Sequence, residues 1–236
     1  GHLPLIRTLL IGSGPFVDAL VEGLDARGHA TATVEPDRDR SVSAGESPEL
    51  DAVEPGLRAA VGLLGVPDLV VHVPAVTDGP VAINDQEPDA WAAACEAPMV
   101  EAIGVARAVG NLVDLGDPGP ESGPRRLVWI LPTTALGGSA GFVGVGAAGE
   151  GIRALAKGAA RQWGTSCTTA VLAVSPTLLF DGSGPPDEGS LSPPALGGPG
   201  DVTTDVASLV DLLADPRSRF ATGGTLVADG GSWMAP

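Results

Sequence analysis

Short apolar runs alternate along the chain with segments whose apolar residues recur at helical spacing. The runs of strand length cover residues 5–11, 30–34, 68–73, 127–131, 169–174 and 225–228. The helical patterns cover residues 15–27, 55–64, 88–109, 143–163 and 201–214. Strands that alternate with helices in this way predict a parallel sheet covered by helices on both faces.

Several residues mark where these elements begin and end. Pro15 suits the first position of a helix, and Arg27 followed by Gly28 supplies a cation in the last turn and a glycine just past it. Asp201 or Thr203 is expected to cap the last helix, because short oxygen-bearing side chains accept hydrogen bonds from the first backbone amides.

Three features interrupt the regular pattern. Pro98 lies in the middle of the 88–109 segment and predicts a kink, because proline cannot donate a backbone hydrogen bond. Residues 36–54 are rich in charge, serine and proline and are expected to form a loop. Residues 180–200 are so dense in proline and glycine that we expect an irregular surface loop there.

Length and charge narrow the classes of protein. The 236 residues suit one large α/β domain over 1–236, and the formal net charge of −16 would repel nucleic-acid phosphates and anionic lipids. No apolar stretch reaches the roughly 18–20 residues that span a bilayer. Cys95 and Cys167 have no C-x-x-C spacing, and the start of the sequence shows no secretory segment, so we expect a reduced, cytoplasmic protein.

A set of ordered motifs suggests a family. The run Asp-Val-Ala-Ser-Leu-Val-Asp-Leu-Leu-Ala-Asp within 201–233 is followed by Thr-Gly-Gly at 222–224 and Val-Ala-Asp-Gly-Gly at 227–231. Earlier matches are Asp-Leu-Val-Val at 68–71, Trp91, and Ala-Val-Ser-Pro at 173–176. From residue 5 to about 234 the chain thus resembles the short-chain dehydrogenase/reductase (SDR) family. The resemblance implies a Rossmann-type doubly wound parallel sheet in three layers, with residues 180–200 in the substrate-loop region.

The residues at the family's catalytic positions depart from its pattern. In that family a helix Asn, a Ser after the fifth strand and a Tyr-x-x-x-Lys pair carry the chemistry; the resemblance places there Pro98, Pro132, Val145 and Gly149, in that order. None of them can transfer a proton, and the chain has no tyrosine at all. Thr133 supplies a hydroxyl only if the register slips by one residue. Lys157, the sole lysine, lies two turns beyond Gly149 and is expected to be a solvated helix residue.

The cofactor loop is altered as well. Of the family's three glycines, Gly12 remains, whereas the second and third positions hold Phe16 and Asp18. We expect Phe16 to obstruct the pyrophosphate position, and Asp18 to compete for the same helix-terminal amides. Gly14 is a weak signal for a different loop shape, and Glu35 ends the second strand where an acidic residue can bind the ribose of NAD. We therefore expect no cofactor, or at most weak residual NAD binding.

Other candidate groups are few. His72 could act as a base or be a structurally paired strand residue, and Glu150 could act as an acid or base or be a surface charge. Thr133 and Thr134 would join them in a non-redox site. No cluster of His, Cys, Asp and Glu has the spacing of metal ligands, and neither a Walker loop nor a Gly-x-Ser-x-Gly elbow occurs.

The preferred hypothesis is an SDR-like pseudoenzyme subunit that assembles with an active SDR paralogue and supports or regulates it. The resemblance implies a homo- or hetero-oligomer formed through helices 88–109 and 143–163, and the second of these is rich in glycines that close helix packing would compensate. The rival hypothesis is an enzyme of this fold with non-redox chemistry: dehydration, isomerisation or cyclisation of a small or carrier-bound metabolite. The third is an NAD(P)-dependent oxidoreductase with an atypical site.

Overall fold

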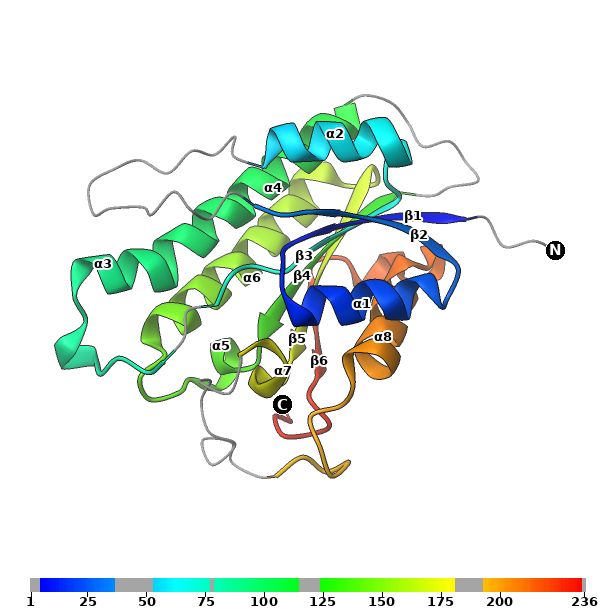
Figure 1. Ribbon diagram of the computed structural model, residues 1–236. Coiled ribbons are helices and arrows are strands. Elements are labelled where there is room, and N and C mark those ends of the chain that lie inside the picture. Colours follow the sequence, from blue (N-terminus) through cyan, green and yellow to red (C-terminus); the bar gives the residue numbers. More distant parts are fainter. Residues whose placement is uncertain (1–4, 37–52, 77–78, 115–123, 181–192, 235–236) are drawn as a thin grey trace.

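One parallel sheet forms the centre of the molecule (Figure 1). The computed structural model describes residues 5–36, 53–76, 79–114, 124–180 and 193–234, and within these ranges six strands pair in the order β2-β1-β3-β4-β5-β6. They are β1 (Ile6–Ile11), β2 (His29–Val34), β3 (Leu69–His72), β4 (Arg125–Pro132), β5 (Cys167–Val174) and β6 (Gly224–Ala228), and every pairing is parallel. The predicted parallel sheet is confirmed.

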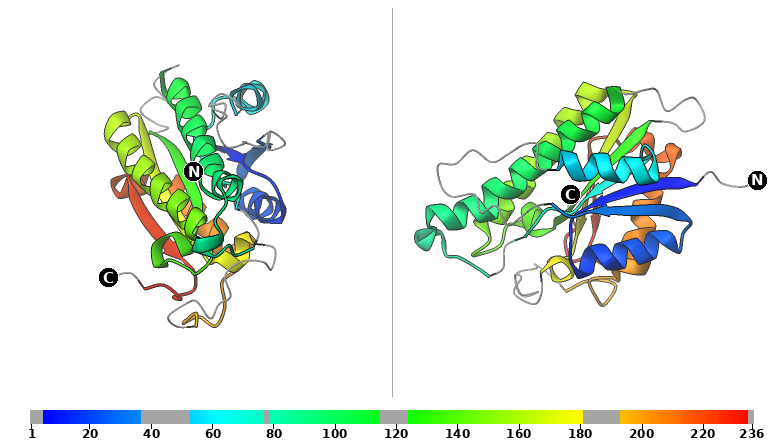
Figure 2. Two further views of the ribbon diagram at one scale, coloured as in Figure 1. Left: turned by 90° about the vertical axis from the view of Figure 1, so that its left-hand side faces the viewer. Right: turned by 45° about the horizontal axis from the view of Figure 1, so that its top comes forward.

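Helices cover both faces of the sheet, as the alternating pattern predicts (Figure 2). One face carries α2 (Glu54–Leu64), α4 (Ala97–Asp114) and α6 (Val143–Trp163), and the other carries α1 (Pro15–Asp25) and α8 (Ala207–Ala214). Shorter elements are α3 (Pro88–Trp91), α5 (Thr134–Gly137), α7 (Pro176–Leu179), single 3-10 turns at Ile83–Asp85 and Pro216–Ala221, and π-type turns at Ala92–Glu96 and Val202–Val206. This is a three-layer, Rossmann-like α/β fold.

The hydrophobic core lies in two layers, one on each face of the sheet. Alternate residues of β4 point to opposite faces, so that Leu127 and Trp129 pack against α4 and α6 while Val128 and Ile130 pack against α1 and α8. All eight residues of β4 are buried. Each large aliphatic side chain buried in this way contributes about 1.5–3 kcal/mol of hydrophobic stabilisation.

The predicted helix 88–109 is not regular throughout: it contains the π-type turn at Ala92–Glu96 just before Pro98, and such turns are a common site of helix kinks. Most predicted boundaries agree with the structure, but one detail was wrong. Arg27 lies beyond the last turn of α1, where its guanidinium donates to the carbonyl oxygens of Gly23, Thr203 and Thr204.

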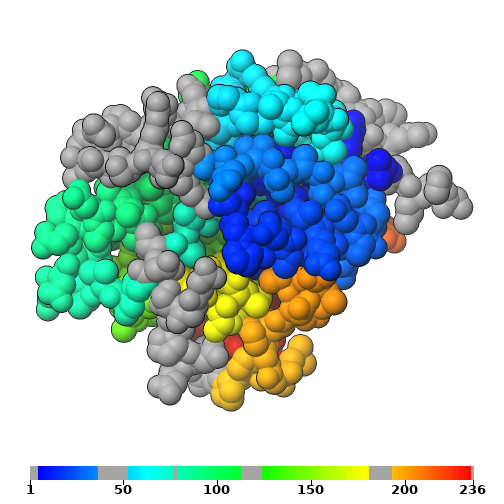
Figure 3. Space-filling view, viewed as in Figure 1, coloured from blue at the N-terminus to red at the C-terminus, as the bar shows by residue number. Residues whose placement is uncertain are grey.

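The capping prediction for the last helix is confirmed at Asp201. Its Oδ1 accepts a hydrogen bond of 2.8 Å from the backbone N–H of Thr204, and Thr203 instead faces α1. The helix α1 and the turn Val202–Val206 pack so closely that a Cβ at Gly23 would lie 2.3 Å from the Thr203 oxygen. Figure 3 shows the surface of α1 running into that of α8 on this side.

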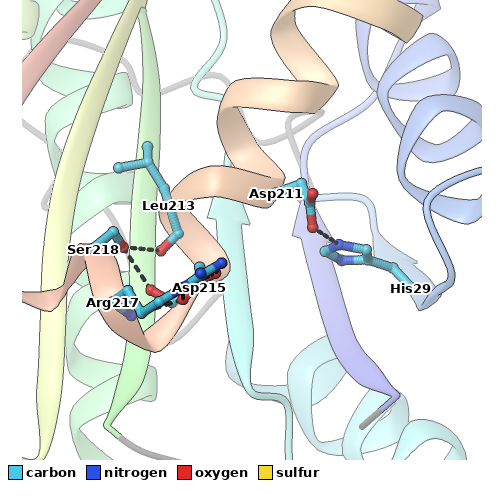
Figure 4. Close-up of polar contacts among 6 residues, drawn as sticks. All are labelled: His29, Asp211, Leu213, Asp215, Arg217 and Ser218. Atoms are coloured by element: carbon cyan, nitrogen blue, oxygen red, sulfur yellow. Dashed lines mark hydrogen bonds and ion pairs between the residues drawn. The ribbon is translucent and has the colours of Figure 1, made fainter. Parts of the chain in front are cut away.

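A buried histidine makes polar contacts between the sheet and α8. His29, buried at the start of β2, is hydrogen-bonded through Nδ1 to Thr8 Oγ1 at 2.7 Å and through Nε2 to Asp211 Oδ1 at 3.0 Å. Figure 4 shows the contact between Asp211 on α8 and His29. The imidazole thus joins β1, β2 and α8.

The segment after β6 turns back across the sheet edge. The Asp229 carboxylate is buried and accepts hydrogen bonds from the backbone N–H groups of Gly231, Ser232 and Trp233. The Trp233 ring then lies over α5, where a Cβ at Gly137 would be 3.2 Å from it.

The two predicted loops are described only in part. Residues 193–200 form turns, in agreement with the irregular stretch expected there, whereas 181–192 and most of 36–54 lie outside the described residues. Across the described ranges no helix has both the length and the apolar character needed to cross a bilayer.

Candidate functional site

The candidate residues for cofactor binding meet at the carboxyl ends of β1 and β2, the edge where sheets of this kind bind ligands. The backbone N–H of Gly12 donates to the Val34 oxygen at 3.0 Å, so that Glu35, the next residue, lies beside the β1–α1 turn. Glu35 is exposed. The structure therefore brings Gly12, Gly14 and Glu35 into one region, as the sequence predicts.

Two glycines shape the β1–α1 turn. Gly12 has φ of +150°, and a Cβ there would lie 3.0 Å from the Val73 oxygen at the end of β3. Gly14 has φ of +95°, precedes the first residue of α1 and has open space around its Cβ position. The N-terminus of α1 is thus accessible at Gly14, while Gly12 is required by backbone packing.

The residues at the other two cofactor-loop positions differ in exposure. Phe16 is buried in the core between α1 and the sheet, where it belongs to the cluster containing Val17, Leu20 and Val174. Asp18 is exposed on the first turn of α1. A carboxylate at that place repels an anion at the helix N-terminus, so Asp18 fits a dinucleotide pyrophosphate poorly. Phe16 packs into the core instead of filling the space at the turn, so the expected obstruction by its ring is not found.

Val145, at the position that the resemblance gives to the catalytic tyrosine, lies in an apolar cluster. It is 7% exposed and packs with Phe142 and Phe180, which make an edge-to-face contact at 5.5 Å between ring centroids. Val76 and Leu179 pack against the same cluster from the segments after β3 and β5. Apolar side chains from three parts of the chain therefore surround this position.

Gly149, at the position given to the lysine, faces another element of the same chain. A Cβ added to Gly149 would lie 2.4 Å from the Ala135 Cβ on α5, well inside any real contact between carbon atoms. No side chain fits at residue 149 unless α5 moves away from α6. This packing contact explains the glycine without reference to catalysis.

The two prolines at the remaining positions are also structural. Pro98 is buried near the start of α4, and Pro132 is the buried last residue of β4. After Pro132 the backbone N–H of Thr133 donates to the Val174 oxygen at 2.9 Å, which holds Thr133 at the sheet edge. Thr134 Oγ1 is buried, and within the described ranges it has no hydrogen-bond partner.

His72 does not face this edge. It lies in β3 on the same face as Val70, packed toward α4, and its Nε2 is 2.7 Å from Glu101 Oε1. Its Nδ1 is buried and has no partner in the described part of the chain. Of the two interpretations left open for His72, the structure favours the paired strand residue.

Glu150 and Lys157 lie on the outer surface of α6. Glu150 is exposed and forms an ion pair with Arg153, whose Nε also donates to Thr225 Oγ1 on β6 at 3.1 Å. Lys157 is exposed, as expected for a solvated helix residue. Glu150 lies on the outer surface of α6, and His72 faces α4. The structure therefore does not bring these two residues together with Thr133 and Thr134 in the site of the non-redox hypothesis.

Two further glycines of α6 contact other parts of the same chain. A Cβ at Gly144 would lie 2.6 Å from Ala94 Cβ, and one at Gly151 would lie 2.5 Å from Met99 Sδ. Close packing of α6 against the helical segment 92–114 thus accounts for two of the glycines that the sequence hypothesis assigned to a partner molecule. Gly158 has open space around it.

Sequence reasoning missed the groups that fill and support this region: the Phe142–Phe180 contact, the Ala135–Gly149 contact and the carboxylate partner of His72. Phe142 and Phe180 are two of only four phenylalanines in the chain, and that scarcity was a usable signal. Nothing in the sequence marks Ala135 or Glu101. In the described ranges no group of three or more His, Cys, Asp and Glu side chains could hold a metal ion.

Comparison with known proteins shows the fold. No protein-family model matches the sequence, and no curated protein sequence matches it. Among solved structures, the chain is similar to the 3-ketoacyl-(acyl-carrier-protein) reductase from Brucella melitensis complexed with NADH, with a TM-score of 0.76 and 18% sequence identity. The match covers 96% of this chain and 98% of that chain. The fold implied by the sequence resemblance is thereby confirmed.

Proposed function

We propose that this chain is a pseudoenzyme of SDR-like fold, which has no redox catalysis of its own and assembles with an active short-chain dehydrogenase that it supports or regulates. The observation that carries the proposal is the packing at Val145 and Gly149. Val145 lies in an apolar cluster, and Gly149 packs directly against Ala135 of α5.

The chemistry of carbonyl reduction requires a proton donor within hydrogen-bond reach of the substrate oxygen. Val145 and its neighbours Phe142 and Phe180 offer no such group, and no tyrosine is present anywhere in the chain. The Ala135 contact leaves no room for a lysine at residue 149. These features support a protein that keeps the fold without the proton-transfer pair.

Cofactor affinity is expected to be absent or very weak. The exposed carboxylate of Asp18 opposes a pyrophosphate at the N-terminus of α1, and Gly12 is explained by its contact with Val73. Glu35 is the feature that favours NAD, because it is exposed beside the turn.

The catalytic part is tested with purified protein and a broad panel of ketones and alcohols, with NADH, NADPH and their oxidised forms. We expect no turnover above the buffer rate, and no heat of NADH binding at micromolar concentration. Turnover that Thr133→Val removes would contradict the proposal. If NADH does bind, Glu35→Ala should weaken it, whereas Glu54→Ala on α2 serves as the control.

The assembly part rests on surfaces that remain open after the chain has folded. Gly158 lies exposed on α6, and Leu226 on the edge strand β6 and Phe220 just before it are exposed apolar residues. Leu226 lies on the α8 side of the sheet and Gly158 on the α6 side, so a related subunit packed against the β6 edge could contact both.

Light scattering, alone and with a co-encoded active SDR paralogue, tests this part. Gly158→Leu should reduce assembly by at least severalfold, whereas Gly62→Leu on α2, where the Cβ position is equally open, should not. Gly151 is unsuitable because a side chain there would collide with Met99. A wild type that stays monomeric at high concentration and ignores the paralogue would contradict the proposal.

One observation favours the rival, an enzyme with non-redox chemistry. Thr134 Oγ1 is buried near the end of β4 and has no hydrogen-bond partner among the residues described, and such a group often meets a ligand or an ordered water. A Thr134→Val variant distinguishes the two: loss of a metabolite-dependent activity at unchanged stability would favour the rival. The likeness to a reductase complexed with NADH keeps the oxidoreductase hypothesis as a third candidate.

A further inference from the structure

The strand β6 forms an open edge of the sheet. It pairs with β5 alone, and Figure 2 shows it at the rim beside α6. The N–H of Gly223, just before the strand, donates to the Thr169 oxygen at 2.7 Å. Because successive strand residues direct their backbone groups to opposite sides, those of Gly224, Leu226 and Ala228 point away from β5. In the described part of the chain no further strand pairs with these outward groups.

Basic side chains gather on the elements beside this edge. The segments 143–163 and 215–228 contain two acidic residues, Glu150 and Asp215, and five basic residues, which are Arg153, Lys157, Arg161, Arg217 and Arg219. The whole chain, in contrast, has 13 basic and 29 acidic residues. The surroundings of β6 are therefore a positively charged region on a strongly acidic protein.

The helix α6 brings three of the basic residues to one side of the edge. Arg153, Lys157 and Arg161 follow one another at intervals of four residues, which places them along one side of the helix. Arg153 Nε donates to Thr225 Oγ1 on β6 at 3.1 Å. A Cβ at Gly223 would lie 3.7 Å from the Lys157 Cα, because the turn before β6 packs directly against α6. This row of cations thus runs alongside the edge strand.

The 3-10 turn Pro216–Ala221 supplies the other two basic residues. Arg217 and Arg219 are exposed on this turn, which leads into β6 from the α8 side. The Arg219 guanidinium lies 5.3 Å from the centroid of the exposed Phe220 ring. Cations therefore flank the amino end of β6 on both faces of the sheet.

Three of the five cations have no carboxylate partner in the described ranges. Glu150 pairs with Arg153, and Asp215 pairs with Arg217, a contact that Figure 4 shows. Lys157, Arg161 and Arg219 are exposed and form no ion pair with any described residue. Exposed charges of one sign attract a partner of the opposite sign and fix its orientation.

A second copy of this chain does not meet that requirement. Pairing of two β6 edges would add three further unpaired cations and no carboxylate, and like charges across an interface are unfavourable. An extended segment that carries carboxylates satisfies both the open backbone groups of the strand and the charges beside it. Addition of such a segment to a sheet edge is a common mode of peptide recognition.

We propose that the β6 edge binds an acidic, extended segment of the partner chain as an added strand. The outward backbone groups of β6 pair with the segment, and Lys157, Arg161 and Arg219 attract its carboxylates. The proposal rests on the assembly part of the proposed function and names the chemistry of the partner's surface.

The test uses short labelled peptides and fluorescence anisotropy at 0.05 M salt. A seven-residue peptide of alternating glutamate and threonine should bind with a dissociation constant of about 0.1 mM or below. A peptide of alternating lysine and threonine should not bind. A peptide of alternating glutamate and proline keeps the charge but cannot pair as a regular strand, so it should bind at least severalfold more weakly.

Charge reversals test the cations. Lys157→Glu, Arg161→Glu and Arg219→Glu should each weaken binding of the glutamate–threonine peptide about threefold or more at 0.05 M salt, and less at higher salt. The control is Arg58→Glu, which makes the same change of charge at an exposed arginine of α2, on the other side of the sheet. It should leave binding unchanged.

A proline tests the strand pairing. Leu226→Pro removes an outward N–H without removing a bond to β5, so it should abolish binding, whereas Leu226→Ala should keep most of it. If Leu226→Pro does not fold, the glutamate–proline peptide decides the same point.

Equal binding of the glutamate–threonine and glutamate–proline peptides would mean that the region attracts any polyanion, and would overturn the proposal. Three charge reversals without effect would do the same. A wild type that assembles with the active paralogue but ignores the acidic peptide contradicts this inference alone. Peptide binding without any assembly contradicts only the proposed function.

Discussion

Ala135 and Gly149 make the contact on which the shape of the proposed inactive site depends. Gly149→Lys should lower the free energy of unfolding by about 1–3 kcal/mol, because the new Cβ would lie 2.4 Å from the Ala135 Cβ and force α5 away from α6. Urea denaturation followed by circular dichroism measures the change.

The control is the same substitution at an open place in another helix, outside the proposed interface. Gly62→Lys on α2 should be neutral or stabilise the protein by up to about 1 kcal/mol, since lysine has a higher helix propensity than glycine and meets no neighbour there. Adding Ala135→Gly should recover part of the loss in Gly149→Lys. If both lysine variants lose equal stability, the contact with α5 is not the cause.

The two thiols should differ in reactivity. Burial raises the pKa of Cys167 to about 12, and burial followed by the charge of Glu96 raises the pKa of Cys95, which is only partly buried. The thiolate is the reactive form, so a thiol reagent at pH 8 should modify Cys167 only after unfolding. In a Cys95→Ser variant we expect no fast reaction without denaturant. Prompt modification of the folded variant would mean that the start of β5 opens readily.

At the scale of elements, the turn after α8 depends on one carboxylate. Hydrogen bonds from Arg217 lower the pKa of Asp215 from 3.8 to about 2. Because the folded state favours the charged form, Asp215 contributes stability above about pH 3.8, and the contribution disappears as the pH falls toward 2.

Asp215→Asn should therefore be less stable than the wild type at pH 5, and the two should converge near pH 2. The difference should be small, since Arg217 is exposed and solvent screens the pair. Thermal unfolding at pH values from 2 to 6 measures it. A constant difference over this range would assign the loss to the capping geometry rather than to the charge.

Elements with strong local patterns could be predicted from the sequence alone. Helix 143–163 and the strands were placed within one or two residues, because their apolar periodicity extends over whole elements. The four-residue helices α5 and α7 were not predicted, since they are too short to show a period and form where the chain turns at the sheet edge. The π-type turn before Pro98 was also missed, because the proline indicates an interruption of the helix but not the form that the interruption takes.

Some features of the candidate site could likewise be predicted from the sequence, and others could not. The position of Gly12 and Glu35 followed from the order of the strands, because the carboxyl ends of neighbouring parallel strands share one edge. The direction of His72 and the contact of Gly149 with Ala135 could not be derived, because both depend on which helix packs beside the sheet. Side-chain pairing across elements is set by tertiary structure.

For the whole molecule, net charge is the dominant electrostatic feature. At a formal charge of −16, added salt should raise the melting temperature, because it screens repulsion within the folded chain. The screening length falls from about 30 Å at 0.01 M to about 8 Å at 0.15 M salt, so most of the effect should occur in this interval. Scanning calorimetry measures it. A melting temperature that falls with salt would mean that ion pairs such as Arg7–Asp68 outweigh the repulsion.

The Trp233 ring over Gly137 gives the segment after β6 an optical signal of its own. The chain has four tryptophans and no tyrosine, so its intrinsic emission comes from the indole rings alone. Trp129 is fully buried in the sheet and reports the core, whereas Trp233 is partly exposed and reports whether the turn held by Asp229 stays against α5. A quencher dissolved in the buffer reaches the second ring before the first. Trp91 and Trp163 are partly exposed as well, so phenylalanine must replace both. In that variant, detachment of the segment can be followed by fluorescence while the rest of the protein remains folded.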